Sequence, residues 1–262
     1  MGYHPTVGRF AQRDPVEDGP NLYENVKSNP VNLTDPMGLY VTASLRGNDI
    51  VMEVGITLWS PWEPSVSDYF LRNVRENIQR GLRLLEQNNP YKVCHSKSKK
   101  VYPVRWTPNI QITYDKHSTS KPGNQHYVEV RDNGYILGLT GGQNAFSPTI
   151  SPENNQSGWG VWSYEMGGSA SEYNGWWAAH EVMHFAGLDD AYSWATGEPN
   201  AKYVGKNNKG QPILTNIMAG NGGTVTNVRS YSLDQEQIEK ILTTRLKEAL
   251  GWIYKVDYTI IK

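Results

Sequence analysis

The sequence lacks the features that mark several common protein classes. Its single cysteine, Cys94, cannot form a disulfide within the chain, and no Cys–His motif accompanies it. No apolar run approaches the ~20 residues that a membrane-spanning helix needs. The first ten residues, MGYHPTVGRF, contain no apolar signal-peptide core. The formal net charge of −1 gives no electrostatic reason to expect nucleic acid or an anionic membrane as a partner.

Aromatic and turn-forming residues, in contrast, are plentiful. The chain contains 9 Trp and 16 Tyr, which supply large surfaces for burial although hydrophobic residues make up only 38% of the sequence. Its 25 Gly and 15 Pro indicate a loop-rich fold with short strands. A length of 262 residues is enough for one sizeable core, or for a small domain and a larger one.

The stretch WAAHEVMHFAGLDDAY, Trp177–Tyr192, carries the strongest functional pattern. His180 and His184 are spaced so that, on a helix, both imidazoles lie on one face and can hold a single metal ion. Glu181 lies beside that face, where it can reach a water molecule on the metal. The five-residue pattern alone has limited specificity. The alternative is a surface helix with two solvated histidines and a Glu in a salt bridge.

Two further features favour a metal site over that alternative. Gly187 follows the second histidine and is a natural helix stop, because glycine adopts the left-handed conformation at low cost. Beyond it the chain can turn back and bring Asp189 or Asp190 to the metal. The second feature is the segment Asn216–Ala219 further along the chain, which reads NIMA.

These segments resemble a known enzyme family. HEVMHFAGLDD resembles the extended zinc signature of metzincin metallopeptidases, H-E-x-x-H-x-x-G-x-x-H, with Asp in place of the third His. TNIMAG resembles the family's Met-turn, whose methionine, here Met218, lies beneath the zinc. The resemblance implies a Zn²⁺ ion bound by His180, His184 and Asp190, a ligand set of known catalytic type. Asp189 would then hydrogen-bond nearby backbone or the second nitrogen of a histidine.

The activity implied by this resemblance is that of a zinc-dependent endopeptidase acting on a protein or peptide substrate. Zinc lowers the pKa of a bound water from ~15.7 towards ~7. Glu181 would take the proton from the attacking water and pass it to the leaving amine. Two alternatives stay open: a zinc amide hydrolase that acts on cell-wall peptides, and a non-catalytic binding domain with a structural metal.

Residues 1–39 differ in composition from the rest of the chain. They contain Asp-Pro and Asn-Pro dipeptides, which favour tight turns and extended segments. Such a segment is too short to fold alone, so one interpretation is a disordered leader. However, GRFAQRDP and NLYENVKSNPVNLTDPMGL closely resemble the end of the core in Rhs and YD-repeat proteins. The resemblance implies that residues 1–39 close an Rhs core and that residues 40–262 form the C-terminal toxin domain.

In the Rhs family a repeat shell precedes this segment and releases the toxin by autoproteolysis after the Leu of DP-x-GL. The cut would therefore fall between Leu39 and Tyr40. The family's aspartate pair matches Asp14 and Asp35, and two carboxylates that share a proton can activate water. The resemblance also implies an upstream Rhs shell and a cognate immunity protein as partners. It implies a toxin that is secreted, or injected into a target cell, by a specialised secretion system.

Hydrophobic periodicity predicts the main elements of an α+β fold. Strands are expected at residues 48–59, 101–115, 126–131, 134–139 and 159–164. Helices are expected at 68–88 with Ser67 as N-cap, around the two histidines, and at 234–250. Residues 92–100 are expected to form a basic solvated loop and residues 191–208 a polar loop. His126 lies outside any ligand spacing. The metzincin resemblance adds a twisted mixed sheet, a long helix, a zinc helix, a Met-turn and a C-terminal helix.

Overall fold

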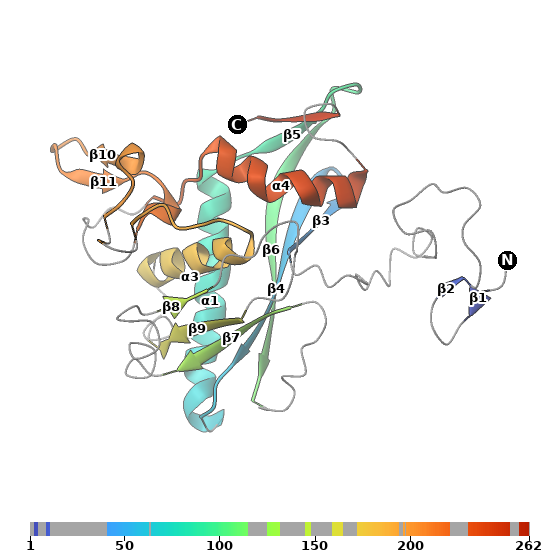
Figure 1. The fold of residues 1–262 in the computed structure, drawn as a ribbon. Helices are drawn as coiled ribbons and strands as arrows, with labels where there is room; N and C mark the ends of the chain where they lie inside the picture. The colour runs from blue at the N-terminus through green and yellow to red at the C-terminus, as the bar shows by residue number, and fades with distance from the viewer. Residues whose placement is uncertain are drawn as a thin grey trace. The chain divides into compact units, whose positions relative to one another are not determined.

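The fold is described from a computed structural model (Figure 1). It describes residues 3–4, 9–10, 41–62, 64–114, 125–131, 145–147, 159–164, 172–193, 196, 198–220, 230–251 and 257–261. The strand expected at 134–139 lies outside these residues. The chain divides into two compact units, Met1–Met37 and Gly38–Lys262. The described part of the first unit is an antiparallel pair, β1 (Tyr3–His4) and β2 (Arg9–Phe10).

The second unit is built on a mixed eight-stranded sheet. Its strands are β3 (Val41–Arg46), β4 (Asp49–Trp59), β5 (Lys92–His95), β6 (Val101–Thr113), β7 (His126–Arg131), β8 (Ala145–Phe146), β9 (Trp159–Ser163) and β12 (Tyr258–Ile261). Their order is β12-β5-β6-β4-β7-β9-β8, and β3 also pairs with β4. The pairs β4–β6, β4–β7 and β7–β9 are parallel, whereas β3, β5, β8 and β12 join antiparallel. Strands and helices thus combine around one mixed sheet, as expected.

The centre of the sheet is the longest apolar strand, β4. Its alternate residues are all fully buried: Ile50, Met52, Val54, Ile56 and Leu58. Most of the residues between them are buried too, which is the pattern of a central strand with both faces covered. The strands predicted at 126–131 and 159–164 are present as β7, which pairs with β4, and β9, which pairs with β7.

Three α-helices are described in the second unit: α1 (Pro64–Asn88), α3 (Glu172–Phe185) and α4 (Gln235–Leu250). The apolar stripe that predicted α1 is buried at Leu71, Val74, Ile78, Leu82 and Leu85. The predicted start of this helix is wrong. It begins at Pro64, because proline fits the first helical position. Ser67 is therefore inside the helix and not its cap, and its hydroxyl donates to the Trp62 carbonyl at 3.3 Å.

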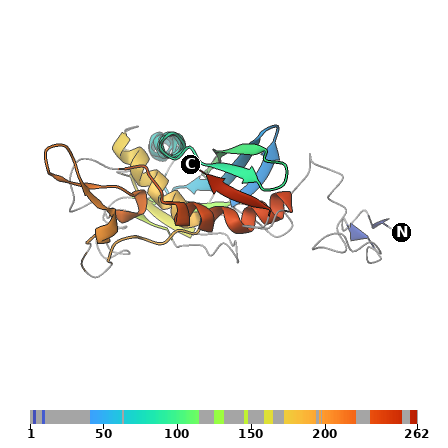
Figure 2. The ribbon, with the colours of Figure 1, turned by 90° about the horizontal axis from the view of Figure 1, so that it is seen from above.

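α1 and α3 cross each other in close contact (Figures 1 and 2). A Cβ atom placed on Gly81 of α1 would lie only 2.0 Å from the Gly175 carbonyl oxygen of α3. It would also lie 2.9 Å from the Ala179 Cβ atom. The absence of a side chain at Gly81 therefore sets how closely α3, which carries the paired histidines, packs against α1.

Several short elements differ from the prediction or were not predicted. Residues 92–100 are not one solvated loop, because Lys92–His95 form β5 between β6 and β12. In β5 only Val93 is fully buried, so the strand has too weak an apolar pattern to be recognised. The polar segment 191–208 contains a 3₁₀ helix, η3 (Ala201–Tyr203), and β10 (Val204–Lys206), which pairs with β11 (Pro212–Leu214). None of the described helices is both long and apolar enough to cross a membrane.

Candidate metal centre

α3 is buried on every side over its second half. Ala178, Ala179, Val182, Met183 and Phe185 are all fully buried. The two histidines and the glutamate between them are buried as well, with His180 1%, Glu181 4% and His184 5% exposed. This excludes the alternative of a surface helix with solvated histidines. Three polar side chains inside an apolar core need hydrogen-bond or metal partners, so the groups around them indicate their role.

The chain reverses directly after α3 through a Schellman motif. The Leu188 N–H donates to the Met183 carbonyl at 3.0 Å, and the Gly187 N–H donates to the His184 carbonyl at 2.9 Å. This motif requires positive φ at Gly187, where φ is 100°. The helix stop predicted from Gly187 is thus confirmed, and it returns the following residues to the histidine face.

Asp190 is the acidic residue that reaches the histidines. Its Oδ1 atom lies 3.2 Å from His180 Nε2 and 3.4 Å from His184 Nε2, and its side chain is 4% exposed. Ligand atoms bonded to one tetrahedral ion at about 2.0–2.2 Å lie about 3.3–3.5 Å apart. Oδ1 has no hydrogen bond of normal geometry to any described residue. The spacing and the donor types therefore fit a divalent metal ion held between the three side chains.

Glu181 is a second carboxylate near the same imidazoles. One of its oxygens lies within 4.8 Å of a ring nitrogen of His180 and of His184. Asp190 fits the ligand position better, because its separations from both Nε2 atoms are those of a tetrahedron. Glu181 Oε2 is buried and has no hydrogen-bond partner among the described residues. An acceptor left in this way is available to a water molecule beside the metal position.

Backbone carbonyls orient both imidazole rings. His180 Nδ1 lies 2.9 Å from the Ile217 carbonyl oxygen, and His184 Nδ1 lies 2.8 Å from that of Leu188. A carbonyl can only accept, so each Nδ1 carries the hydrogen and donates a hydrogen bond, and each neutral ring keeps its lone pair on Nε2. That is the tautomer a metal ligand needs, and second-shell bonds of this kind are usual at metal sites.

Asp189 has a different role from the one expected. Its Oδ2 accepts a hydrogen bond from Lys240 Nζ on α4 at 2.9 Å, and its side chain is 68% exposed. The two histidine Nδ1 atoms that it might have contacted are bonded to backbone carbonyls instead. Asp189 therefore forms a surface ion pair, and the expectation that it bonds a histidine is wrong.

The charges at the site favour an ionised Asp190. Burial raises the pKa of this carboxyl, but its contacts with His180 and His184 outweigh burial and hold the pKa well below its usual range. For His184, burial lowers the pKa, while Asp190 and Glu181 raise it, and the net shift is upward. The pocket thus stabilises positive charge opposite the Asp190 carboxylate.

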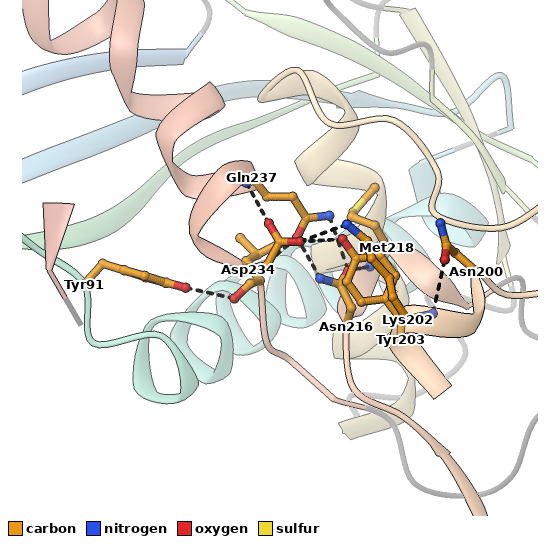
Figure 3. Close-up of polar contacts among 9 residues, drawn as sticks. Tyr91, Asn200, Lys202, Tyr203, Asn216, Met218, Asp234 and Gln237 are labelled. Carbon is orange, nitrogen blue, oxygen red and sulfur yellow. Dashed lines mark hydrogen bonds and ion pairs between the residues drawn. The ribbon is translucent and has the colours of Figure 1, made fainter. Parts of the chain in front are cut away.

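Met218 lies in the 3₁₀ helix η4 (Ile217–Ala219) and is fully buried. The Asn216 side chain caps η4 by accepting from the Met218 N–H at 2.9 Å (Figure 3). The Met218 carbonyl accepts from the Ala191 N–H at 2.8 Å. Since the Ile217 carbonyl contacts His180, one tight turn contacts both the first histidine and the residue after Asp190.

The predicted residues therefore divide into two groups. His180, Glu181, His184, Asp190 and the Met218 turn come together in one buried site. The four predicted processing residues, Asp14, Asp35, Leu39 and Tyr40, lie outside the described residues. The carbonyls of Leu188 and Ile217 were missed, because a backbone acceptor has no side-chain signature in the sequence.

Comparisons with known proteins add little to this geometry. No family model matches the chain, and no curated protein matches it either. Among solved structures, metalloproteinase-II from Bacteroides fragilis resembles it with a TM-score of 0.35 and 11% sequence identity. The similarity covers 80% of this chain and 58% of that one, so the chain spans little more than half of its length. A likeness at this level does not bear on the chemistry, which has to be argued from the site itself.

Proposed function

We propose that this chain is a zinc-dependent endopeptidase in which His180, His184 and Asp190 hold the metal ion. The observation that carries the proposal is the pair of distances from Asp190 Oδ1 to the two Nε2 atoms, 3.2 and 3.4 Å. Two histidines and one carboxylate form a three-ligand set that leaves a position for water or substrate, as catalytic zinc sites do.

In this proposal the chain's own residues hold and move the proton. Zinc, when bound, would polarise the substrate carbonyl and lower the pKa of the attacking water. Glu181 would accept the water's proton at its buried carboxylate and deliver it to the leaving amine. The Ile217 and Leu188 carbonyls would keep both histidines in the ligating tautomer throughout. Met218 would form the apolar floor.

One rival is a non-catalytic domain with a structural metal. Structural zinc sites are closed by four protein ligands and need no additional buried carboxylate. Glu181 brings such a carboxylate next to the three ligands, and its Oε2 has no partner among the described residues. This observation favours catalysis. The other rival, an amide hydrolase for cell-wall peptides, shares the same site and differs only in its substrate.

The proposal is tested by expressing the chain in a susceptible cell with and without Glu181→Gln. The substitution keeps the size of the side chain and removes its basicity. We expect equal zinc per purified chain and growth arrest only with the wild type. Growth arrest by the Glu181→Gln protein would contradict the proposed catalytic activity. Arrest accompanied by release of cell-wall peptides, with cellular proteins intact, would favour the amide hydrolase.

We also propose that residues 1–39 end an Rhs core and that residues 40–262 are its released toxin. The support is the sequence resemblance of GRFAQRDP and NLYENVKSNPVNLTDPMGL. The proposal includes an upstream shell, an immunity protein and delivery into a target cell by a specialised secretion system. In a chain that carries the full shell, mass spectrometry should find a fragment that begins at Tyr40. Asp14→Asn or Asp35→Asn should abolish it, and a different first residue would disprove the assignment.

A further inference from the structure

A series of hydrogen bonds between polar side chains connects the start of α4 to η4 (Figure 3). It begins with the capping box of α4. The Gln237 N–H donates to Asp234 Oδ1 at 2.8 Å, and the Asp234 N–H donates to Gln237 Oε1 at 3.0 Å. These two bonds satisfy backbone donors that the first turn of a helix otherwise leaves unpaired.

Gln237 makes contacts that a capping box does not require. Its Oε1 also accepts from Asn216 Nδ2 at 2.7 Å, and its Nε2 donates to Asn216 Oδ1 at 3.4 Å. The two amides therefore face each other and bond in both directions. Asn216 is only 2% exposed, so water cannot readily replace its bonds to Gln237.

Asn216, held by Gln237, is also bonded to the turn that orients His180. Its Oδ1 accepts from the Met218 N–H at 2.9 Å, which fixes the first residues of η4. The Ile217 N–H donates to the Ser232 carbonyl at 2.9 Å, so η4 is also tied to the segment leading into α4. The Ile217 carbonyl then lies 2.9 Å from His180 Nδ1. A single side chain, Asn216, therefore connects Gln237 of the capping box to the turn that carries this carbonyl.

We propose that Gln237 is a positioning residue of the metal centre. Through Asn216 it holds η4 in the conformation that aims the Ile217 carbonyl at His180, and so it sets the affinity for the metal. This inference rests on the metal site of the proposed function. It differs from a plain capping role, which would affect the stability of α4 and leave metal affinity unchanged.

The experiment measures zinc affinity by competition with a chromophoric chelator, together with thermal unfolding of the metal-free protein. Gln237→Ala removes both the cap and the amide pair, and we expect zinc affinity to fall about tenfold, in the range for second-shell ligands. Gln235→Ala in the same turn is the matched control, since Gln235 is exposed and its Nε2 donates to Glu239 Oε1 on the same helix. Its zinc affinity should stay within twofold of the wild type.

Two more variants separate positioning from capping. Gln237→Glu keeps an acceptor for both the Asp234 N–H and Asn216 Nδ2, so it should recover most of the affinity lost in Gln237→Ala. Asn216→Ala and Gln237→Ala break the same series of hydrogen bonds. The double variant should therefore bind zinc no more weakly than Asn216→Ala alone. If Gln237→Ala does not fold, Gln237→Met takes its place, because it keeps the length and helix propensity of the side chain.

The outcomes distinguish this inference from the proposed function. If the wild type binds zinc and Gln237→Ala binds it equally well while unfolding at a lower temperature, Gln237 is only a helix cap and the inference is overturned. Additive losses in the double variant would overturn it as well. A wild type that binds no zinc would remove the metal centre itself, and the inference with it.

Discussion

Asp189 and Asp190 are adjacent in sequence but meet different partners. Asp190 is buried between two imidazoles, whereas Asp189 pairs with Lys240 at the surface. An exposed ion pair contributes little to the stability of the fold. A metal ligand, in contrast, contributes directly to the affinity for the metal. The reversal at Gly187 explains the difference, since only the third residue after it reaches the histidine face.

The first prediction compares these two aspartates. Asp190→Ala should weaken zinc binding by more than the ~10–100-fold that loss of an outer-shell partner costs, and it should lose most of its zinc in dialysis against a weak chelator. Asp189→Ala should keep nearly all of it. The measurement is zinc per chain for both variants. A metal-free Asp189→Ala protein, or full zinc in both, would show that the third ligand is assigned wrongly.

A buried histidine outside the metal centre should make stability depend on pH. His126 is fully buried and stacks on Phe185 with ring centroids 4.2 Å apart. Burial, with a smaller effect from Arg245, lowers its pKa from 6.5 to about 3. Below pH 6.5 the unfolded chain therefore takes up a proton that the folded chain does not. The stability due to neutral His126 is present above about pH 6.5 and is lost as pH falls towards 3.

The second prediction follows from that sign. In the metal-free protein, urea unfolding should show stability falling between about pH 6.5 and 4, with His126 contributing at most about 1.4 kcal/mol per pH unit. His126→Phe keeps a ring against Phe185 and should flatten the slope. His95→Phe, on a partly exposed strand end, is the control. An unchanged slope in His126→Phe would contradict the assignment.

At the scale of elements, the contact of α1 with α3 holds the histidine helix in place. A methyl group at Gly81 would overlap the Gly175 carbonyl. The helices would have to separate, or one of them would have to shift.

The third prediction is that Gly81→Ala destabilises the fold by about 1–3 kcal/mol, as overpacking of a close contact does. This occurs even though alanine has the higher helix propensity. Arg83→Ala, at an exposed position of the same helix, should change stability little. Urea unfolding measures both. Equal or greater stability in Gly81→Ala would mean that the helices are not in such close contact.

Whether an element could be predicted from the sequence depends on how long its apolar pattern is. β4, β7, β9, α1 and α4 were recognisable because each has a sustained apolar pattern. Gly187 predicted the end of α3, since few other residues accept its positive φ. The short strands β5, β10, β11 and β12 have too few buried residues for a pattern. The metal-facing side chains were predicted from their spacing, but the carbonyls that orient them depend on tertiary packing alone.

At the scale of the whole second unit, the site joins segments that are distant in sequence. α3 supplies His180, Glu181 and His184, the reversal after it supplies Asp190, and η4 supplies the carbonyl that orients His180. The start of α4 contacts η4 through Gln237. A buried site assembled in this way, with an acidic side chain beside three potential ligands, is the basis for proposing catalysis.

The most direct test is a proteome-wide count of new protein N-termini in a cell lysate treated with the purified chain. Wild type, Glu181→Gln and chelator-treated wild type are compared at equal concentration, after zinc per chain has been measured. The wild type should create many new N-termini. Glu181→Gln should hold as much zinc yet cleave roughly 10²–10⁴-fold more slowly, because only proton transfer is lost. Cleavage by Glu181→Gln at the wild-type rate, or no new N-termini from a zinc-loaded wild type, would contradict the peptidase assignment.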